Sequence, residues 1–269
     1  MTLTARIIPA TGNPGEPSIV LTPTLSAPLE VGKECEVRLQ MNWKRDGTPV
    51  SPDDLLVVHT ERIHLLIIDS SLEDYHHEHP KPTEKPGEFV FRFTPKRAGD
   101  YRVFADVTPA LSQAQEYVEC DLAGMGNGGP VINRIDTRQS ASAGLNFDLR
   151  WLTGGGPVLA RRPVTAIVTI KDAEGRPFRR LEPVMGAFAH IVGFYEDRKT
   201  VVHIHPSDAD PKSPDDRGGP SFMFRLYAPR SGYIRLFCQT QVDGKQVFAP
   251  FGLNVEDKPF NAGQKPGAR

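Results

Sequence analysis

Apolar and polar residues alternate in short runs along most of the chain, and these runs end at glycine, proline or aspartate. Cys35–Leu39, Phe89–Phe93 and Tyr101–Phe104 are examples of the alternation. A period of two is typical of a strand with one buried face, and the 3.6-residue period of an amphipathic helix is nearly absent. One short helical turn is predicted at Ser51–Asp54, where serine can cap and proline can begin it. The pattern predicts an all-β protein built from antiparallel β-sandwiches.

The chain also repeats itself. A five-residue strand segment beginning with histidine is followed, after eight intervening residues, by His-x-His-Pro, and this pattern occurs twice at a constant shift of 126 residues. The matched segments are His64–Ile68 with His77–Pro80, and His190–Phe194 with His203–Pro206. Further matches, such as Phe89–Arg92 with Phe222–Arg225, follow in the same order. Ordered matches across both halves predict a duplicated domain.

A glycine-rich segment separates the two halves. Residues 123–130 contain four glycines and one proline, which is typical of a flexible linker. We therefore expect one β-sandwich at 18–122 and a second at 131–257. The polar end of the chain, 258–269, is predicted to be disordered.

Composition excludes several classes of protein. The 32 basic and 33 acidic residues nearly cancel, which argues against nucleic acid as the main partner. The longest apolar runs, such as Ile63–Ile68, are too short for a membrane-spanning segment. Three widely spaced cysteines do not make a disulfide framework. The first residues lack the pattern of a signal peptide, so the compartment stays open.

The histidines are the residues most indicative of chemistry, because six of the eight occupy the repeated positions and the other two, His59 and His76, lie beside the first set. Side chains two residues apart in a strand share a face, so His203 and His205 point the same way. His190, on the preceding strand, shares that face if the hairpin loop has an even length, either two residues or four. The same reasoning brings His64 together with His77 and His79.

Three convergent imidazoles are good ligands for Zn²⁺, Cu²⁺ or Ni²⁺ and leave a fourth position open. Pro80 and Pro206 should end each hairpin just after its last histidine, at a sheet end that solvent and metal can reach. The alternative is that these histidines are ordinary hairpin residues, whose duplication reflects shared ancestry alone.

Two further residues are weaker candidate ligands. His59 and Met185 occupy equivalent positions five residues before His64 and His190, and in an unbroken strand they point to the opposite face. A bulge at the following glycine could turn Met185 inward. Asp106 and Gln239 are equivalent to each other and are either hydrogen-bond partners of an imidazole or ordinary strand-end polar groups. His76 should point away from the site into solvent.

The His-Leu-Leu-Ile-Ile segment with its His-x-His-Pro end, and the later Gly99–Asp106, resemble a group of poorly characterised bacterial proteins. Most of these are predicted to be exported and carry Ig-like or cupredoxin-like β-sandwich repeats. The resemblance covers about residues 34–255 and implies a role near copper or other heavy-metal handling. It also implies an exported or periplasmic location, which the start of this chain does not support.

These observations favour binding of a transition metal, copper or zinc, through a three-histidine site in each repeat. The protein would then act as a carrier, buffer or sensor. One alternative is an interaction or adhesion module without metal, with a protein partner. Another is a metalloenzyme that activates water, which would need a carboxylate or general base beside the metal.

Overall fold

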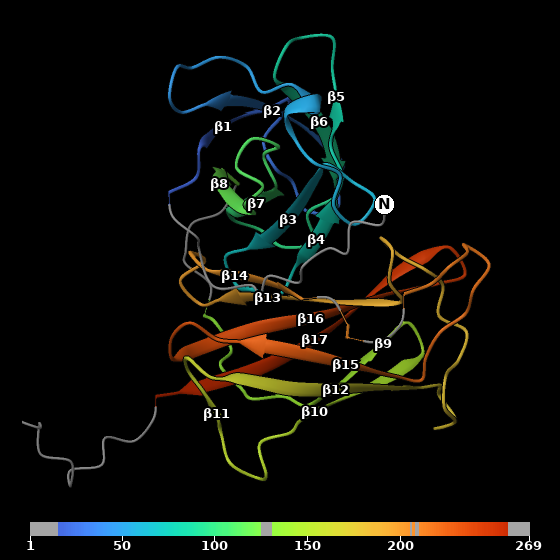
Figure 1. Ribbon diagram of the computed structural model, residues 1–269. Helices are drawn as coiled ribbons and strands as arrows, with labels where there is room; N and C mark the ends of the chain where they lie inside the picture. The colour runs from blue at the N-terminus through green and yellow to red at the C-terminus, as the bar shows by residue number, and fades with distance from the viewer. Residues whose placement is uncertain (1–15, 125–130, 205, 208–209, 258–269) are drawn as a thin grey trace, which may run out of the picture.

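The computed structural model describes residues 16–124, 131–204, 206–207 and 210–257 (Figure 1). Within these ranges the chain forms seventeen strands, no α-helix and one 3-10 turn. The strands build two β-sandwich domains in tandem, each from two sheets, so the predicted fold class is confirmed. The proposed limits of the domains, linker and tail remain predictions, and 125–130 and 258–269 lie outside the described residues.

The first sandwich pairs a sheet of order β1-β2-β6-β5 with one of order β4-β3-β7-β8. Its strands are β1 Ile19–Leu25, β2 Cys35–Trp43, β3 Ile63–Asp69, β4 Tyr75–Glu78, β5 Lys81–Pro82, β6 Glu88–Phe93, β7 Tyr101–Val107 and β8 Glu116–Leu122. The predicted helical turn is the 3-10 turn η1, Pro52–Asp54, which is capped by the Ser51 side chain as expected.

The second sandwich pairs a sheet of order β15-β12-β10-β9 with one of order β11-β17-β16-β13-β14. Its strands are β9 Gln139–Ser142, β10 Leu145–Trp151, β11 Val158–Leu159, β12 Pro163–Lys171, β13 Ala189–Tyr195, β14 Val201–Ile204, β15 Ser221–Tyr227, β16 Gly232–Val242 and β17 Lys245–Glu256. The run β4-β3-β7-β8 corresponds to β14-β13-β16-β17, as the internal repeat predicts.

Each sandwich has its own hydrophobic core. Along β10 buried and exposed residues alternate strictly, which is the pattern of a sheet with one face toward solvent. Strands β3 and β13 are different, because all seven residues of each are buried. Leu65 and Ile67 of β3 enter the first core, and Ile191 and Tyr195 of β13 enter the second. Their other faces must therefore be covered by something else.

A third apolar cluster covers those faces and joins the two domains. It combines side chains of both sandwiches: Leu66, Ile68, Leu72, Tyr75, Phe104 and Tyr117 from the first, with Val192, Phe194, Val201, Tyr233 and Phe237 from the second. In Figure 1 the sheet that contains β3 and β4 stands directly over β13 and β14. The two histidine hairpins are therefore packed against each other.

Two arginines fix this packing by equivalent contacts. Arg235 Nε of the second domain donates to the backbone oxygen of Leu72 at 3.1 Å. In return, Arg102 of the first domain donates through an Nη1–H to the backbone oxygen of Arg198 at 2.9 Å. Leu72 and Arg198 lie 126 residues apart, at the same place in the two hairpin loops, and both have positive φ. The interface thus has approximate two-fold symmetry within one chain.

A search of the described residues finds no helix of the length and hydropathy that crossing a membrane requires.

Candidate metal centre

The hairpin of β3 and β4 sets the positions of the first three histidines. Leu66 pairs with His77, and Ile68 with Tyr75. This register leaves a four-residue loop at 70–73, so the longer of the two even loops is formed. The Asp69 carboxylate closes the loop by accepting backbone N–H groups of Ser71, Glu73 and Asp74. Because the loop length is even, His64 shares a face with His77.

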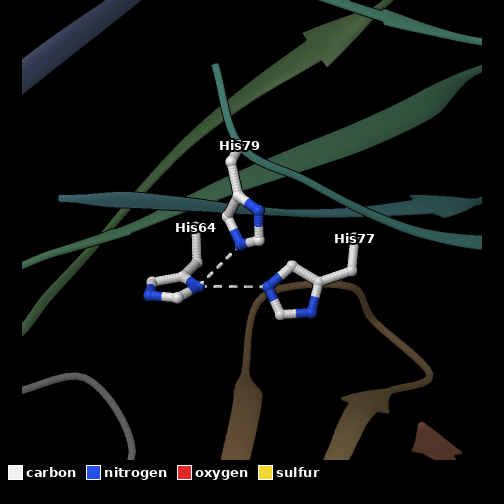
Figure 2. A group of neighbouring side chains, drawn as sticks. All are labelled: His64, His77 and His79. Carbon is white, nitrogen blue, oxygen red and sulfur yellow. Dashed lines mark hydrogen bonds between the residues drawn. The ribbon is translucent and has the colours of Figure 1, made fainter. Parts of the chain in front are cut away.

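The three imidazoles meet at one point. His64 Nδ1 lies 3.2 Å from His77 Nε2 and 3.2 Å from His79 Nε2. Figure 2 shows the nitrogens of His77 and His79 directed toward that one nitrogen of His64. The three candidate ligand atoms lie within 4.8 Å of one another, and this cluster could hold a metal ion. His64 and His77 are both 3% exposed, and His79 is half-buried.

Hydrogen bonds on the outer side of two rings determine where their protons lie. His64 Nε2–H donates to the backbone oxygen of Val58 at 2.9 Å, since a carbonyl oxygen can only accept. His77 Nδ1–H donates to Oε1 of Gln239 at 2.8 Å. In the neutral rings, His64 Nδ1 and His77 Nε2 are therefore unprotonated, and both lone pairs face the centre of the cluster.

The surroundings keep these rings neutral. Burial and, to a smaller extent, electrostatic repulsion from the neighbouring His203 lower the pKa of His64 from 6.5 to about 4. The same two causes hold the pKa of His77 well below 6.5 and lower the pKa of His79. Neutral imidazole is the form that binds metal, so the cluster is ready for a cation at neutral pH.

The spacing of the nitrogens also fits a metal. Two ligands of a tetrahedral ion, each at about 2.0–2.1 Å, lie about 3.3 Å apart. The 3.2 Å distances from His64 Nδ1 match this value. Without a shared proton or cation, two lone pairs at this distance repel each other. The donor set of three imidazoles therefore fits Zn²⁺ or Cu²⁺.

The second hairpin repeats the design as far as it is described. Val192 pairs with His203, which gives the same four-residue loop, and His190 and His203 share a face with ring centroids 5.8 Å apart. His190 Nε2–H donates to the backbone oxygen of Val184 at 2.8 Å, as His64 does to Val58. His205 lies outside the described residues, so a second triad remains a prediction.

The two histidine groups lie next to each other at the domain interface. The His203 ring centroid is 5.9 Å from that of His64 and 5.6 Å from that of His77. Its Nδ1 lies 3.0 Å from Oδ2 of Asp106, which also accepts hydrogen bonds from Gln115. Asp106 and Gln239 are thus hydrogen-bond partners of imidazoles, but each serves a histidine of the other repeat.

The convergence of the two histidine groups has no counterpart among the expectations from the sequence. Each site was expected at an open sheet end, and for His64 and His77 this expectation is wrong because the opposite repeat covers them. The available signal was the nearly continuous apolar run of β3. An apolar run without alternation indicates a strand that is buried on both faces.

His59 and Met185 do not lie in unbroken strands as expected. Each begins a two-residue reversal with positive φ at both positions: Val58 bridges Glu61 around His59, and Val184 bridges Ala187 around Met185. The reversal brings the His59 ring to 6.5 Å from that of His64, so its predicted far-face position is wrong. At Met185 the structure has this tight turn in place of the bulge considered.

His76 points away from the cluster, as expected, but it is not in solvent. Its side chain is 11% exposed and its Nε2 lies 3.0 Å from Oδ1 of Asp74. The ring packs against Phe93 with centroids 5.2 Å apart. Because His76 adjoins His77 but faces the first core, it is a natural control position.

Comparisons with known proteins add a family but no activity. A family profile described as "Domain of unknown function (DUF8832)" matches residues 20–121 and 146–257. No curated protein matches the chain.

Solved structures show a distant likeness. The chain is similar to Escherichia coli alpha-2-macroglobulin activated by porcine elastase, at 11% identity and a TM-score of 0.30 over 90% of this chain and 20% of that one. It is also similar to a glycosyl hydrolase family 2 member from Bacteroides cellulosilyticus, at 13% identity and a TM-score of 0.23 over 88% of this chain and 28% of that one. The chain thus spans less than a third of either protein.

Proposed function

The chain belongs to the family described as "Domain of unknown function (DUF8832)", and we propose that it binds a transition-metal ion, copper or zinc, through His64, His77 and His79. In this role it acts as a metal carrier, buffer or sensor. By the internal repeat, His190, His203 and His205 form a second site of the same kind.

One observation carries the proposal: the lone pairs of two neighbouring imidazoles, His64 and His77, face each other without a proton between them. The outward hydrogen bonds to Val58 and Gln239 aim His64 Nδ1 and His77 Nε2 at each other across 3.2 Å. A cation at the centre converts this repulsion into coordination. Outer hydrogen bonds that fix the ring tautomer are typical of metal-ligating histidines.

Burial favours metal binding over the two alternatives. A metalloenzyme needs an accessible metal with an oriented base, yet His64 and His77 are 3% exposed and the nearby Asp106 carboxylate is engaged by His203 and Gln115. An interaction module needs an exposed apolar face that is open to a protein partner. The outer faces of β3 and β13 are instead buried against each other.

The test compares two adjacent histidines. Zn²⁺ and Cu²⁺ affinities are measured by chelator competition for the wild type, His77→Gln and His76→Gln. Loss of one of three ligands should weaken binding by more than about 100-fold, since loss of an outer partner alone costs 10- to 100-fold. His76→Gln, whose side chain faces Asp74, should bind as the wild type does. Equal affinities in all three proteins would refute the proposal.

A further inference from the structure

Gln239 of the second repeat lies directly behind a histidine of the first. Its side chain is fully buried, and its Oε1 accepts a hydrogen bond from His77 Nδ1 at 2.8 Å, across 162 residues of sequence. Its amide Nε2 donates to Oε1 of Gln246 on the adjacent strand at 2.9 Å. The second bond orients the amide, so that its oxygen is the atom that faces His77.

This contact decides which nitrogen of His77 is available. With Nδ1–H donated to Gln239, the lone pair lies on Nε2, which is the atom that faces His64 Nδ1 at 3.2 Å. In the other tautomer a hydrogen would occupy the centre of the cluster. We propose that Gln239 is a positioning residue for the metal, so that the second repeat completes the metal site of the first.

The symmetric contact shows that each repeat places an oxygen acceptor behind a histidine of the other. At the equivalent place, Asp106 of the first repeat faces His203 Nδ1 of the second at 3.0 Å. The two acceptors differ in charge, because one is an amide and the other a carboxylate. Despite this difference, either oxygen can accept the hydrogen of a ring nitrogen, as the outer partners of metal-ligating histidines do, and so fix which nitrogen keeps the lone pair.

The interface geometry makes the contact dependent on docking of the two repeats. Gln239 pairs with His190 in the sheet of the second domain, and no strand of that sheet pairs with His77. The arginine contacts to the two hairpin loops hold the domains in register. Since the effect is reciprocal, metal bound by the first repeat also stabilises docking of the second.

The experiment first determines the tautomer of His77 in the metal-free full chain from its ring ¹⁵N shifts, assigned with His77→Gln. The wild type should have Nδ1 protonated and Nε2 unprotonated. Gln239→Leu removes the acceptor and should abolish this preference, whereas Gln239→Glu keeps an acceptor and should retain it. Gln241→Leu is the matched control, since Gln241 lies on the same strand but donates to Glu182 of its own domain.

Zn²⁺ affinity is then measured by chelator competition on the same proteins. Gln239→Leu should bind 10- to 100-fold more weakly, as expected for loss of an outer partner, while Gln239→Glu and Gln241→Leu stay near the wild type. A proton on Nε2 in the wild type would overturn the inference, and so would an equal loss of affinity in Gln239→Leu and Gln241→Leu.

Only the effect of Gln239 on metal affinity rests on the proposed function, and its effect on the tautomer of His77 does not. The inference and the proposed function can therefore fail separately. If the wild type binds no Zn²⁺, the proposed function fails and the tautomer of the metal-free protein still decides the role of Gln239. If Gln239→Leu does not fold, the wild-type tautomer and Gln239→Glu decide it.

Discussion

Burial of neutral histidines should make the metal-free protein sensitive to mild acid. The pKa of His64 falls from 6.5 to about 4 on folding, because the ring is buried. Between these values the unfolded chain binds a proton at this residue and the folded chain does not. The contribution of His64 to the free energy of unfolding is therefore fully present above pH 6.5. It declines as the pH falls and stops declining below about pH 4.

The size of the effect follows from the shift. A difference of about 2.5 pKa units is worth about 3 kcal/mol, at 1.36 kcal/mol for each unit. His77 and His190 are also buried and have their pKa held well below 6.5, so they change stability in the same direction. Folded domains are stable by only about 5–15 kcal/mol, so a loss of this size near pH 4 is large.

Two measurements on the metal-free protein test this reasoning. Imidazole proton shifts followed by NMR should show His64 titrating near pH 4. Urea unfolding at a series of pH values should give a stability that rises with pH, and His64→Gln should reduce the slope by about 1.4 kcal/mol per pH unit between pH 4 and 6.5. Titration of His64 near 6.5, or an unchanged slope in the variant, would refute the account.

Three further predictions follow from the same contacts. Zinc affinity should be nearly constant from pH 8 to 6 and fall only as the pH approaches about 4, where His64 protonates; a steep fall already near 6.5 would contradict this. Gly193→Ala should lower the free energy of unfolding by about 1–3 kcal/mol in urea, since its Cβ would lie 2.6 Å from Leu236 Cδ2; an unchanged midpoint argues against this packing. Phe104→Ala should cost about 3–5 kcal/mol and speed amide exchange in β13 across the interface; protection equal to the wild type in β13 would be inconsistent with the joint cluster.

Much of the site could be predicted from the sequence because successive side chains of a strand alternate between the two faces of the sheet. The repeat located the hairpins, and an even loop was enough to place His64 with His77 and His190 with His203. The loop length itself depended on Asp69, whose carboxylate binds three backbone N–H groups. Aspartate, serine and serine in succession at this point were a local signal for that turn.

The reversal at His59 was harder to predict, because its two residues adopt positive φ without a glycine. In the second repeat the same turn contains Gly186, which has φ of +78°. Reading the two repeats together would have indicated a turn at both places. Tertiary structure then brings His59 toward His64, where an unbroken strand would have carried it away.

Docking of the two repeats could not be derived from alternation, because it depends on side chains of different repeats that lie far apart in the sequence and meet across an interface. The burial of both faces of β3 was predictable in principle from its apolar run. The exchange of partners, with Gln239 behind His77 and Asp106 behind His203, follows from the symmetry of the interface and has no local signal.

Metal binding at this cluster is tested by anomalous diffraction from crystals of the full chain grown with Zn²⁺ or Cu²⁺. A peak is expected at about 2 Å from His64 Nδ1, His77 Nε2 and His79 Nε2, with Gln239 still bound to His77 Nδ1. A bound metal that is ligated elsewhere, with these three nitrogens left uncoordinated, would contradict it.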